Sequence, residues 1–373
     1  MLPSSTLRDG AGAVVLEDLG DNSARLADDW LALAFDSLAD SRDLDITTTA
    51  EWSEALRHSH LNGAPARVAL SRSGEALNGV FPYYRSVERV RGISCRKLNA
   101  LSQLYSGRNR LLAVDTEQFA ECLLETLDRE EASWDWLCLT LIHESNSHRA
   151  LLAAARRRGY PTETLSLGES PYIDLPADWE VYFNSLAKKF RWLLRASRKK
   201  LAEEGELSYR LHRGPDDVAP LLAAMYDIEM NSWKESSGTS ITASETQRAF
   251  YERFTPVAAA RGWLRGHVLS LDDKPIAYIY GIRLGPVFHD LKESYRLTVR
   301  DHSPGHVLKT FAFPDLIAEG VTRYDFCGKC DDFKMKWTSL TYHRCELTIQ
   351  RRTLRARLLH VLGQARGWLR LWD

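Results

Sequence analysis

Apolar and polar residues follow helix-like spacing in some parts of the first half of the chain and strand-like spacing in others. Residues 26–38 carry apolar side chains at helical spacing, and β-rich runs follow them. Ser73 and Gly74 suit a hairpin turn between the first two runs. Strands are predicted at 66–72, 75–85, 90–101, 134–142 and 170–175, and further helices at 118–128 and 148–160. This order predicts a mixed α/β domain.

The second half of the chain repeats this theme. A long helix is predicted at 178–205, ending at Gly205. The other predicted elements are helices at 216–234, 243–262 and from Ser303 to about residue 319, and strands at 206–213, 263–271, 274–284, 285–298, 321–327 and 341–350. The order is helix, helix, three antiparallel strands, helix, strand and strand. Both halves share an α/β layout, which suggests that two related domains make up the chain.

The length of 373 residues is too great for one ordinary core, so about two domains are expected. The predicted parts are a loose N-terminal arm at 1–22, a domain at 23–176, a second domain at 177–350 and a terminal helix at 351–373. The apolar fraction of 44% and the charged fraction of 27% are typical of a globular protein. The net charge of −1 means that any basic binding site must be local.

The chain carries no pattern of a membrane span or a signal peptide. No apolar run reaches the ~18 residues that cross a bilayer. Residues 1–20 lack a basic segment followed by an apolar core, so we expect a cytoplasmic location. The six cysteines are then expected to be thiols.

The start of the helix at Ser303-Pro304-Gly305 is unusual in its chemistry. Ser303 suits the N-cap, Pro304 the first helical position, and Gly305 leaves room for a ligand beside the first turn. Free N–H groups and the helix dipole make such a turn an anion site. Additional charge would come from Arg300, His302, His306 and Lys309. The alternative is a plainly capped helix with a solvated basic face.

The element order and three short sequence motifs resemble the GNAT acyltransferases, and more closely their CelD/BcsL-like, FemAB-related subgroup with two tandem domains. Arg300, Ser303 and Gly305 occupy the places of the family's pyrophosphate loop, where Ser303 replaces the first Gly. The subgroup also has a basic helix similar to 185–201 and a YDF strand followed by an acidic residue, an aromatic and Lys. Here these words are Tyr324-Asp325-Phe326 and Asp332-Phe333-Lys334. The resemblance covers roughly residues 25 to 350.

This resemblance implies a fold and an activity. The fold would be two tandem GNAT-like domains, each with a mixed, mostly antiparallel sheet flanked by helices. The activity would be transfer of an acyl group from acyl-CoA to a primary amine, with the pyrophosphate at Ser303-Pro304-Gly305 and no metal. The amine attacks the thioester, a base takes its proton, and a donor protonates the thiolate.

In this fold the acyl group lies where the fourth and fifth strands splay apart, and the fourth strand here is 285–298. Alternation places His289, Leu291, Glu293 and Tyr295 on one face, and Asp290, Lys292 and Ser294 on the other. Glu293 is the first choice for the base and His289 the second. Tyr295 or Tyr324 would protonate the thiolate. The alternatives are paired surface charges, a core aromatic, and a reaction whose base is water.

Several other residues are candidates for substrate binding. Lys334 suits a phosphate or an acceptor carboxylate, and Asp325 and Asp332 lie near it in the sequence. Arg191 and Arg195 belong to the basic helix, which suggests a polyanion or a lipid headgroup as partner. A solvated loop lysine and a solvated charged helix are the alternatives.

The segment 351–372 has the pattern of a helix on an anionic membrane surface. Its apolar face is formed by Leu354, Leu358, Val361, Leu362, Ala365, Leu369 and Trp372, and six arginines and no acid accompany it. A helix docked on its own domain is the alternative. On a membrane, at the inner face, the acceptor would be an amphiphile such as a sphingoid base, as in a bacterial ceramide synthase, or an envelope or polysaccharide precursor.

Other chemistries were weighed against this one. Cys327, Cys330, His343 and Cys345 read C-x2-C-x12-H-x-C, but the last spacing is too short for a usual zinc loop, so no metal is predicted. Aminoacyl transfer from tRNA is a second function, although the near-neutral charge argues against an extended RNA footprint and against DNA. A non-catalytic component of envelope polysaccharide assembly is a third.

Overall fold

The computed structural model describes residues 13–37, 41–90, 92–105, 108–131, 133–236 and 238–359. The strands of the first half are β1 (Val14–Asp18), β2 (Ala66–Ser73), β3 (Ala76–Val90), β4 (Ile93–Ala100), β5 (Leu112–Ala113), β6 (Trp136–Ile142) and β7 (Thr162–Asp174). Those of the second half are β8 (Leu207–His212), β9 (Leu264–Leu271), β10 (Lys274–Leu284), β11 (Val287–Tyr295), β12 (Arg323–Asp325) and β13 (Thr341–Gln350). The fold class is the expected α/β arrangement of mostly antiparallel strands flanked by helices.

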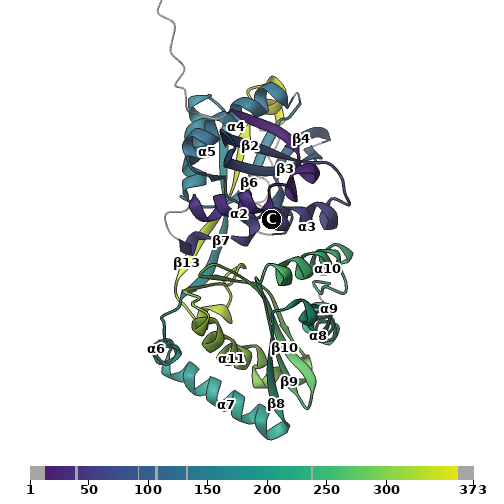
Figure 1. The fold of residues 1–373 in the computed structure, drawn as a ribbon, viewed down its shortest axis with the longest axis vertical. Helices are drawn as coiled ribbons and strands as arrows, with labels where there is room; N and C mark the ends of the chain where they lie inside the picture. Colours follow the sequence, from purple (N-terminus) through teal and green to yellow (C-terminus); the bar gives the residue numbers. More distant parts are fainter. Residues whose placement is uncertain are drawn as a thin grey trace, which may run out of the picture.

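The described strands form one continuous sheet that runs through both halves (Figure 1). Its order is β1–β2–β3–β4–β6–β13–β7–β12–β11–β10–β9–β8, and β5 pairs with β3. The long strand β7 joins the halves, because its first part pairs with β13 and its last three residues pair with β12. Strand β13, although last in the chain, lies between β6 and β7 in the first half-sheet.

Helices cover the half-sheets in separate layers (Figure 1). In the first half they are α1 (Leu19–Ser23), α2 (Ala27–Asp36), α3 (Ala50–His60), α4 (Thr116–Glu130) and α5 (Asn146–Arg157). In the second half they are α6 (Trp179–Ser185), α7 (Lys188–Glu204), α8 (Val218–Met230), α9 (Trp233–Ser236), α10 (Glu245–Ala260) and α11 (Pro304–Ala318). The short 3-10 turn 297–302 precedes α11.

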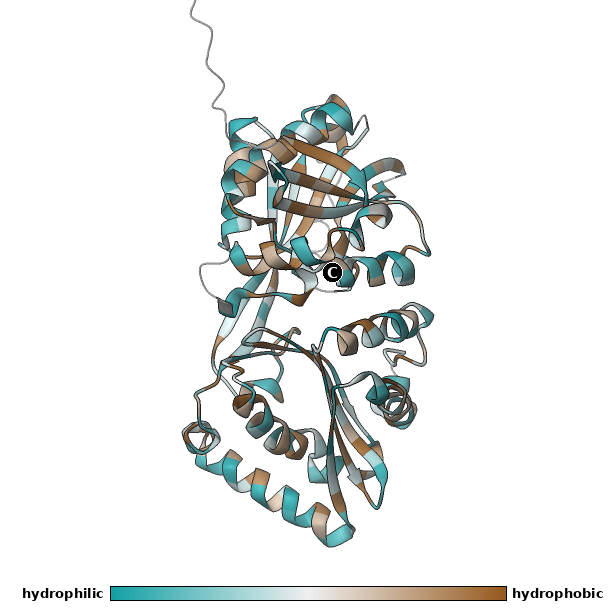
Figure 2. Cartoon of the chain, viewed as in Figure 1, coloured by the Kyte–Doolittle hydropathy of each residue, from teal (hydrophilic) through white to brown (hydrophobic). Residues whose placement is uncertain are grey.

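Three apolar cores hold these layers together. One packs α4 and α5 on the first half-sheet, and another packs α6, α7 and α11 on the second. The third lies between the halves, where Trp52 of α3 meets Phe250 and Phe254 of α10 at ring distances of 4.9 and 5.2 Å. Figure 2 shows apolar residues along the strands of both half-sheets, while α7 is mostly hydrophilic.

Part of the expected N-terminal arm is ordered structure. Val14–Asp18 form β1, which pairs with β2, and α1 follows directly. Val14 and Leu16 alternate with exposed positions and are buried against the first core. The expectation of a loose arm was therefore wrong from Val14 onward, because a single short strand is too brief to show a period among Gly, Ser and Asp.

The expected long helix at 178–205 is interrupted. Leu186 and Ala187 are extended, with ψ values of 153° and 134°, and they separate α6 from α7. The side chain of Leu186 is buried in the second half's core, and Arg191 donates to its carbonyl oxygen at 2.8 Å. Helical spacing continues on both sides, so the break is invisible to a periodicity argument.

Candidate functional site

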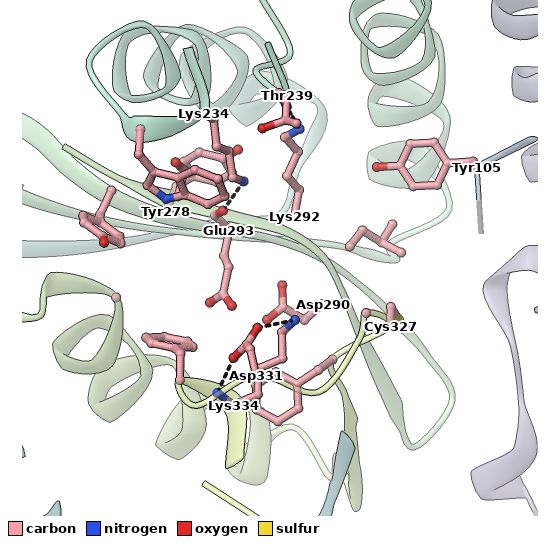
Figure 3. A pocket seen from close by; sticks show the side chains of 18 residues that line it. Tyr105, Lys234, Thr239, Tyr278, Asp290, Lys292, Glu293, Cys327, Asp331 and Lys334 are labelled. Atoms are coloured by element: carbon pink, nitrogen blue, oxygen red, sulfur yellow. Dashed lines mark hydrogen bonds and ion pairs between the residues drawn. The ribbon is translucent and has the colours of Figure 1, made fainter. Parts of the chain in front are cut away.

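A cavity of about 680 Å³ lies in the second half, at the point where β11 and β12 separate (Figure 3). The two strands are parallel and pair only between Val287–His289 and Arg323–Asp325. Beyond this point β11 remains paired with β10 but no longer with β12, and the loop after β12 forms the opposite wall. This is the splayed pair of strands that the sequence led us to expect.

A β-bulge in β11 changes which side chains enter the cavity. Tyr280 of β10 pairs with Lys292 and Gly281 with Asp290, so Leu291 is left without a partner in the ladder. The bulge reverses the alternation, and Asp290 and Glu293 both reach toward α11. The prediction that these two carboxylates lie on opposite faces was therefore wrong. A Cβ at Gly281 would lie 1.9 Å from the Phe288 ring, so this close approach requires glycine.

The ammonium of Lys309 lies at the centre of a buried polar cluster. It is 3.2 Å from Asp290 Oδ2 and 2.6 Å from Glu293 Oε2, and its side chain is fully buried. Lys309 also donates to the hydroxyl of Tyr324 at 3.1 Å, and this hydroxyl donates to Asp290 at 2.6 Å. Burial lowers the pKa of Lys309, but the two carboxylates outweigh it, so the pKa is raised and the ammonium stays charged.

Asp290 is the functional candidate that the sequence analysis missed. Its carboxylate lines the cavity and is almost completely buried. Burial raises the pKa of Asp290 to about 6; the Glu293 carboxylate adds to this rise and the Lys309 ammonium opposes it. A carboxyl group with such a pKa suits a general base near neutral pH. Strict alternation of side chains along β11 places Asp290 on the face opposite Glu293. Only knowledge of the bulge would have placed both carboxylates on the same face.

The four predicted catalytic residues lie in different surroundings. Glu293 and Tyr295 line the cavity, and the side chain of Glu293 is 24% exposed. Tyr324 is buried behind Asp290, and burial raises its pKa well above the usual value. His289 does not line the cavity: its ring nitrogens face the carbonyl oxygens of Ile282 and Leu44 at 3.4 and 3.2 Å. Burial lowers the pKa of His289, so it is a neutral core residue and not a base for this cavity.

The first turn of α11 forms part of the cavity wall through Gly305. Pro304 is at the first helical position, as expected. Ser303 occupies the N-cap in the left-handed conformation, with φ 49° and ψ 52°, and its side chain makes no capping hydrogen bond, contrary to the prediction. Left-handed backbone turns the serine hydroxyl away from the following N–H groups. Its carbonyl oxygen instead accepts from the N–H groups of His306 and Val307, so fewer donors face a ligand than we expected.

The predicted ring of basic side chains is largely engaged elsewhere. His306 stacks on Phe333 at 4.0 Å and accepts a hydrogen bond from Trp337 Nε1 at 3.0 Å. Burial lowers the pKa of His306 to about 3, with Lys309 adding to the effect, so His306 is neutral. His302 contacts Glu204 at the end of α7 at 2.5 Å. With Lys309 held by carboxylates, Arg300 is the exposed cation that remains beside this turn.

The predicted substrate residues after β12 divide into three kinds. Lys334 lines the cavity, where its ammonium is 3.0 Å from Asp331 Oδ2 and donates to the Lys329 carbonyl oxygen (Figure 3). Asp332 is exposed and does not line the cavity. Asp325 is buried in an ion pair with Arg108 of the first half, and so holds the two halves together instead of facing a ligand.

Arg191 and Arg195 lie on α7, which covers α11 on the side away from α8 and α10 (Figure 1). Neither side chain lines the cavity. Arg191 donates to the carbonyl oxygen of Leu186, and the Arg195 guanidinium lies 5.0 Å from the Phe183 ring. Trp192, between them, is 69% exposed.

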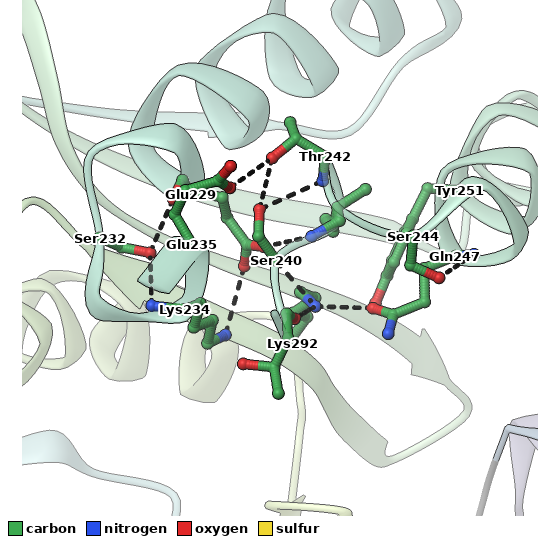
Figure 4. Close-up of polar contacts among 12 residues, drawn as sticks. Glu229, Ser232, Lys234, Glu235, Ser240, Thr242, Ser244, Gln247, Tyr251 and Lys292 are labelled. Carbon is green, nitrogen blue, oxygen red and sulfur yellow. Dashed lines mark hydrogen bonds and ion pairs between the residues drawn. The ribbon is translucent and has the colours of Figure 1, made fainter. Parts of the chain in front are cut away.

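A second polar cluster lines the cavity on the other face of β11 (Figures 3 and 4). The buried carboxylate of Glu229 accepts from Tyr278 at 2.5 Å, from Lys234 at 3.2 Å and from the Ile241 N–H at 2.6 Å. Lys292 lies 3.7 Å from the same carboxylate. Burial lowers the pKa of Lys292 to about 8, and the neighbouring Lys234 adds to the effect. No residue of this cluster was predicted from the sequence as part of a site.

The cysteine and histidine residues weighed as a zinc site do not converge. The imidazole of His343 bonds to Ser166 at 2.9 Å, while Cys345 is buried in the core of the first half. Cys327 lies instead beside Arg108, at the boundary between the main cavity and a neighbouring cavity of about 330 Å³. In the described ranges no group of three or more metal-binding side chains occurs.

Only the first part of the predicted membrane helix falls within the described residues, which end at 359. There Arg351 lies 3.2 Å from Asp128 and Arg355 lies 3.2 Å from Asp135, so both dock onto the first half. Leu354 and Leu358 are 85% and 51% exposed. Residues 360–373 lie outside the described part. Within that part, no helix is long and apolar enough to cross a membrane.

Comparison with known families matches residues 188–335 to the acetyltransferase (GNAT) domain. This part of the chain is therefore an acyltransferase domain of the GNAT type. The matched range contains the first turn of α11, both polar clusters and every residue that lines the cavity except Tyr105. A comparison with curated protein sequences finds no significant match.

Solved structures share this fold at low sequence identity. A conserved protein of unknown function from Bacteroides thetaiotaomicron is 14% identical with a TM-score of 0.59, over 91% of this chain and 100% of that one. FemX is 13% identical with a TM-score of 0.57, over 90% and 98%. The C-terminal domain assigned to a lysylphosphatidylglycerol synthetase of Agrobacterium fabrum is 14% identical with a TM-score of 0.54, over 91% and 95%. These likenesses extend over both halves of the chain and show a shared fold.

Proposed function

We propose that the chain is an acyl-CoA-dependent N-acyltransferase that transfers an acyl group from a CoA thioester to a primary amine. The observation that carries this proposal is the cavity between β11 and β12. One wall is Gly305 in the first turn of α11, and another carries the carboxylates of Asp290 and Glu293. A thioester donor and a base for the attacking amine would thus meet in one space.

The cavity supplies groups for each proton in the reaction. The amine nitrogen bonds to the acyl carbon, the carbon–sulfur bond breaks, and the ammonium proton passes to the Asp290–Glu293 pair. The leaving thiolate takes a proton from Tyr295, which lines the cavity close to Gly305 and regains its proton from solvent. Tyr324 acts through Asp290, because it is buried and donates to that carboxylate.

The pyrophosphate of the donor would lie at the start of α11. Gly305 keeps this surface open, and Arg300 is exposed beside it. Lys334, on the opposite loop, is the other cation near this part of the cavity. The pyrophosphate contacts therefore come from fewer residues than the seven that the sequence suggested, because His306 and Lys309 are committed to the interior.

This proposal specifies the acceptor only as a primary amine. The sequence words shared with the CelD/BcsL-like, FemAB-related subgroup favour an envelope or lipid product, such as a ceramide-like amide or a polysaccharide precursor. The arginine-rich segment 351–372 would then bring the enzyme to an anionic membrane at its cytoplasmic face. Because Arg351 and Arg355 pair with Asp128 and Asp135, the start of this segment belongs to the first half of the protein.

Aminoacyl-tRNA is a second candidate donor, and the surface of α7 is the observation that favours it. Lys188, Lys189, Arg195 and Lys200 are exposed, and the described residues form no ion pair with any of them. An exposed tryptophan, Trp192, adds a surface on which a base can stack. This candidate needs RNA binding that weakens steeply with salt.

The deciding experiment is thermal unfolding of the purified protein with coenzyme A, acetyl-CoA, palmitoyl-CoA or bulk tRNA. A bound donor should raise the midpoint, and the preferred acyl length should give the larger shift. Gly305→Trp should abolish the shift by filling the first turn. Gly305→Ala is the matched control, because a Cβ there would make an ordinary contact 3.4 Å from the Phe333 ring.

The outcomes separate the candidates. A shift with a CoA species that Gly305→Trp removes supports the proposal. A shift with tRNA alone replaces acyl-CoA by aminoacyl-tRNA. Stabilisation by none of the four ligands contradicts a transferase of either kind and favours a non-catalytic role in envelope assembly.

A further inference from the structure

The cavity has two poles of opposite charge, one on each face of β11. Lys309 with Asp290 and Glu293 brings one positive and two negative charges, an excess of one negative charge. On the other face, the ion pairs among the described residues join Lys234 and Lys292 to one carboxylate, that of Glu229, so this cluster carries an excess of one positive charge. Both clusters contribute side chains to the cavity wall.

The two poles are adjacent, and Glu293 links them. Its side chain contacts Lys309 at the negative pole, while its backbone carbonyl oxygen accepts a hydrogen bond from Lys234 at the positive pole. Figure 3 shows Lys234, Lys292 and Thr239 on one side of the strand and the side chains of Asp290 and Glu293 on the other. Because both poles line the same cavity, one ligand bound there can contact both.

The positive pole is fixed by surrounding protein groups. Lys292 donates to Gln247 of α10 at 2.9 Å and to the Thr239 carbonyl oxygen at 3.3 Å, and only 10% of its side chain is exposed (Figure 4). The nearby Glu235 does not neutralise the pole from the cavity, since it accepts from Thr242 at 2.9 Å and does not line the cavity. Two buried ammonium groups with one carboxylate favour a second anion.

We infer that the acceptor is zwitterionic: its amine binds at the Asp290–Glu293 pole and an acidic group on the same molecule binds at the Lys234–Lys292 pole. This inference rests on the proposed function and names its acceptor class. The acidic group is a carboxylate or a phosphate, which both pair with lysine ammonium groups. Simple amines bring no second anion to the positive pole and would bind more weakly.

The experiment compares matched amines that differ in the acidic group. Thiol release from the CoA thioester that binds most tightly is measured with phenylalanine against 2-phenylethylamine, 2-aminohexadecanoic acid against hexadecylamine, and O-phosphoethanolamine against ethanolamine. We expect the acidic member of at least one pair to have a kcat/KM at least ~10-fold higher, mostly through KM. The pair that shows it distinguishes carboxylate from phosphate and short from long chains.

Variants of Lys292 test whether the preference for an acidic acceptor depends on the Lys234–Lys292 pole. Lys292→Met should bring the ratio within the preferred pair toward one, and Lys292→Arg should retain most of it. Lys274→Met, an exposed lysine at the start of β10 that does not line the cavity, is the control and should keep the wild-type ratio. The thermal shift with the donor confirms that each variant is folded, independently of acceptor use.

The inference and the proposed function fail in different ways. If the amines that lack an acidic group react as well as their acidic partners, the inference is overturned and the acyltransferase proposal stays intact. Reaction with none of the six amines removes the inference, and the donor shift then decides the proposed function separately. An acid preference that survives in Lys292→Met also overturns the assignment to this pole.

Discussion

The carboxylate of Asp290 and the ammonium of Lys309 lie 3.2 Å apart and are both buried, and Asp290 lines the main cavity. They come from different elements, β11 and α11, and the bulge at Leu291 brings Glu293 to the same ammonium. One cation thus holds two carboxylates close together. This arrangement gives the attacking amine a carboxylate base that is held beside a positive charge.

Removing the ammonium should destabilise the protein strongly. Lys309→Met leaves the carboxylates of Asp290 and Glu293 close together without their common counter-charge, and we expect a loss of ~3–5 kcal/mol in the free energy of unfolding. Urea denaturation at pH 7 measures this loss. Adding Glu293→Gln should restore part of it, because one negative charge is removed with the positive one. Lys189→Met, at an exposed position, should change stability by less than ~0.5 kcal/mol, and a similar loss in both lysine variants would contradict the role of the cluster.

The rate of acyl transfer should depend on the ionisation of Asp290. Because the folded pKa is about 6, the base is protonated below this pH, and kcat/KM should rise as pH increases through about 6. Asp290→Asn should lower kcat/KM by ~10²–10⁴ and remove this limb. Glu293→Gln is the matched variant, in which the limb should remain. If the limb persists in Asp290→Asn, another group is the base.

His306 should make the protein less stable in acid. Its folded pKa is about 3, below the ordinary value of 6.5, so between these values the unfolded chain binds a proton that the folded chain does not. The free energy of unfolding therefore falls as pH falls below 6.5, by at most ~1.4 kcal/mol per pH unit for this group. His267 contributes in the same direction, since burial lowers its pKa to about 3.

Denaturation at pH 7 and pH 5 tests this dependence. His306→Gln keeps an acceptor for Trp337 but cannot titrate, so the difference in stability between the two pH values should shrink. The exposed His343 provides the control, and His343→Gln should leave the difference unchanged. An unchanged difference in His306→Gln would show that this residue is not the source.

Anionic membranes test the segment beyond the described residues. If 351–372 binds a membrane, the full chain should sediment with phosphatidylglycerol-containing vesicles and much less with pure phosphatidylcholine. Deletion of 360–373 should abolish sedimentation while leaving Arg351 and Arg355 docked. Binding that survives the deletion but is lost in Trp192→Ser would place the membrane contact on α7 instead. Sedimentation with neither lipid would contradict membrane association.

Sequence reasoning recovered most of the elements and missed features that depend on distant partners. The order of strands and helices in the second half was predicted, because most of these elements are long enough to show their own period. The position of β13 between β6 and β7 could not be predicted, since a strand's neighbours are chosen by pairing across the sheet. The break at Leu186 was missed for a similar reason: only burial of that side chain in the core requires it.

The candidate site shows the same division. The sequence alone determined that a proline-led, glycine-containing helix start follows a strand rich in charge, because local chemistry suffices to recognise both. Only the tertiary structure decided that Asp290 joins Glu293 at Lys309, that His306 is neutral, and that Lys234 and Lys292 share Glu229. These outcomes depend on a bulge, on burial and on contacts between elements up to dozens of residues apart. Such interactions act through space, so the spacing of apolar and polar residues along the sequence does not reveal them.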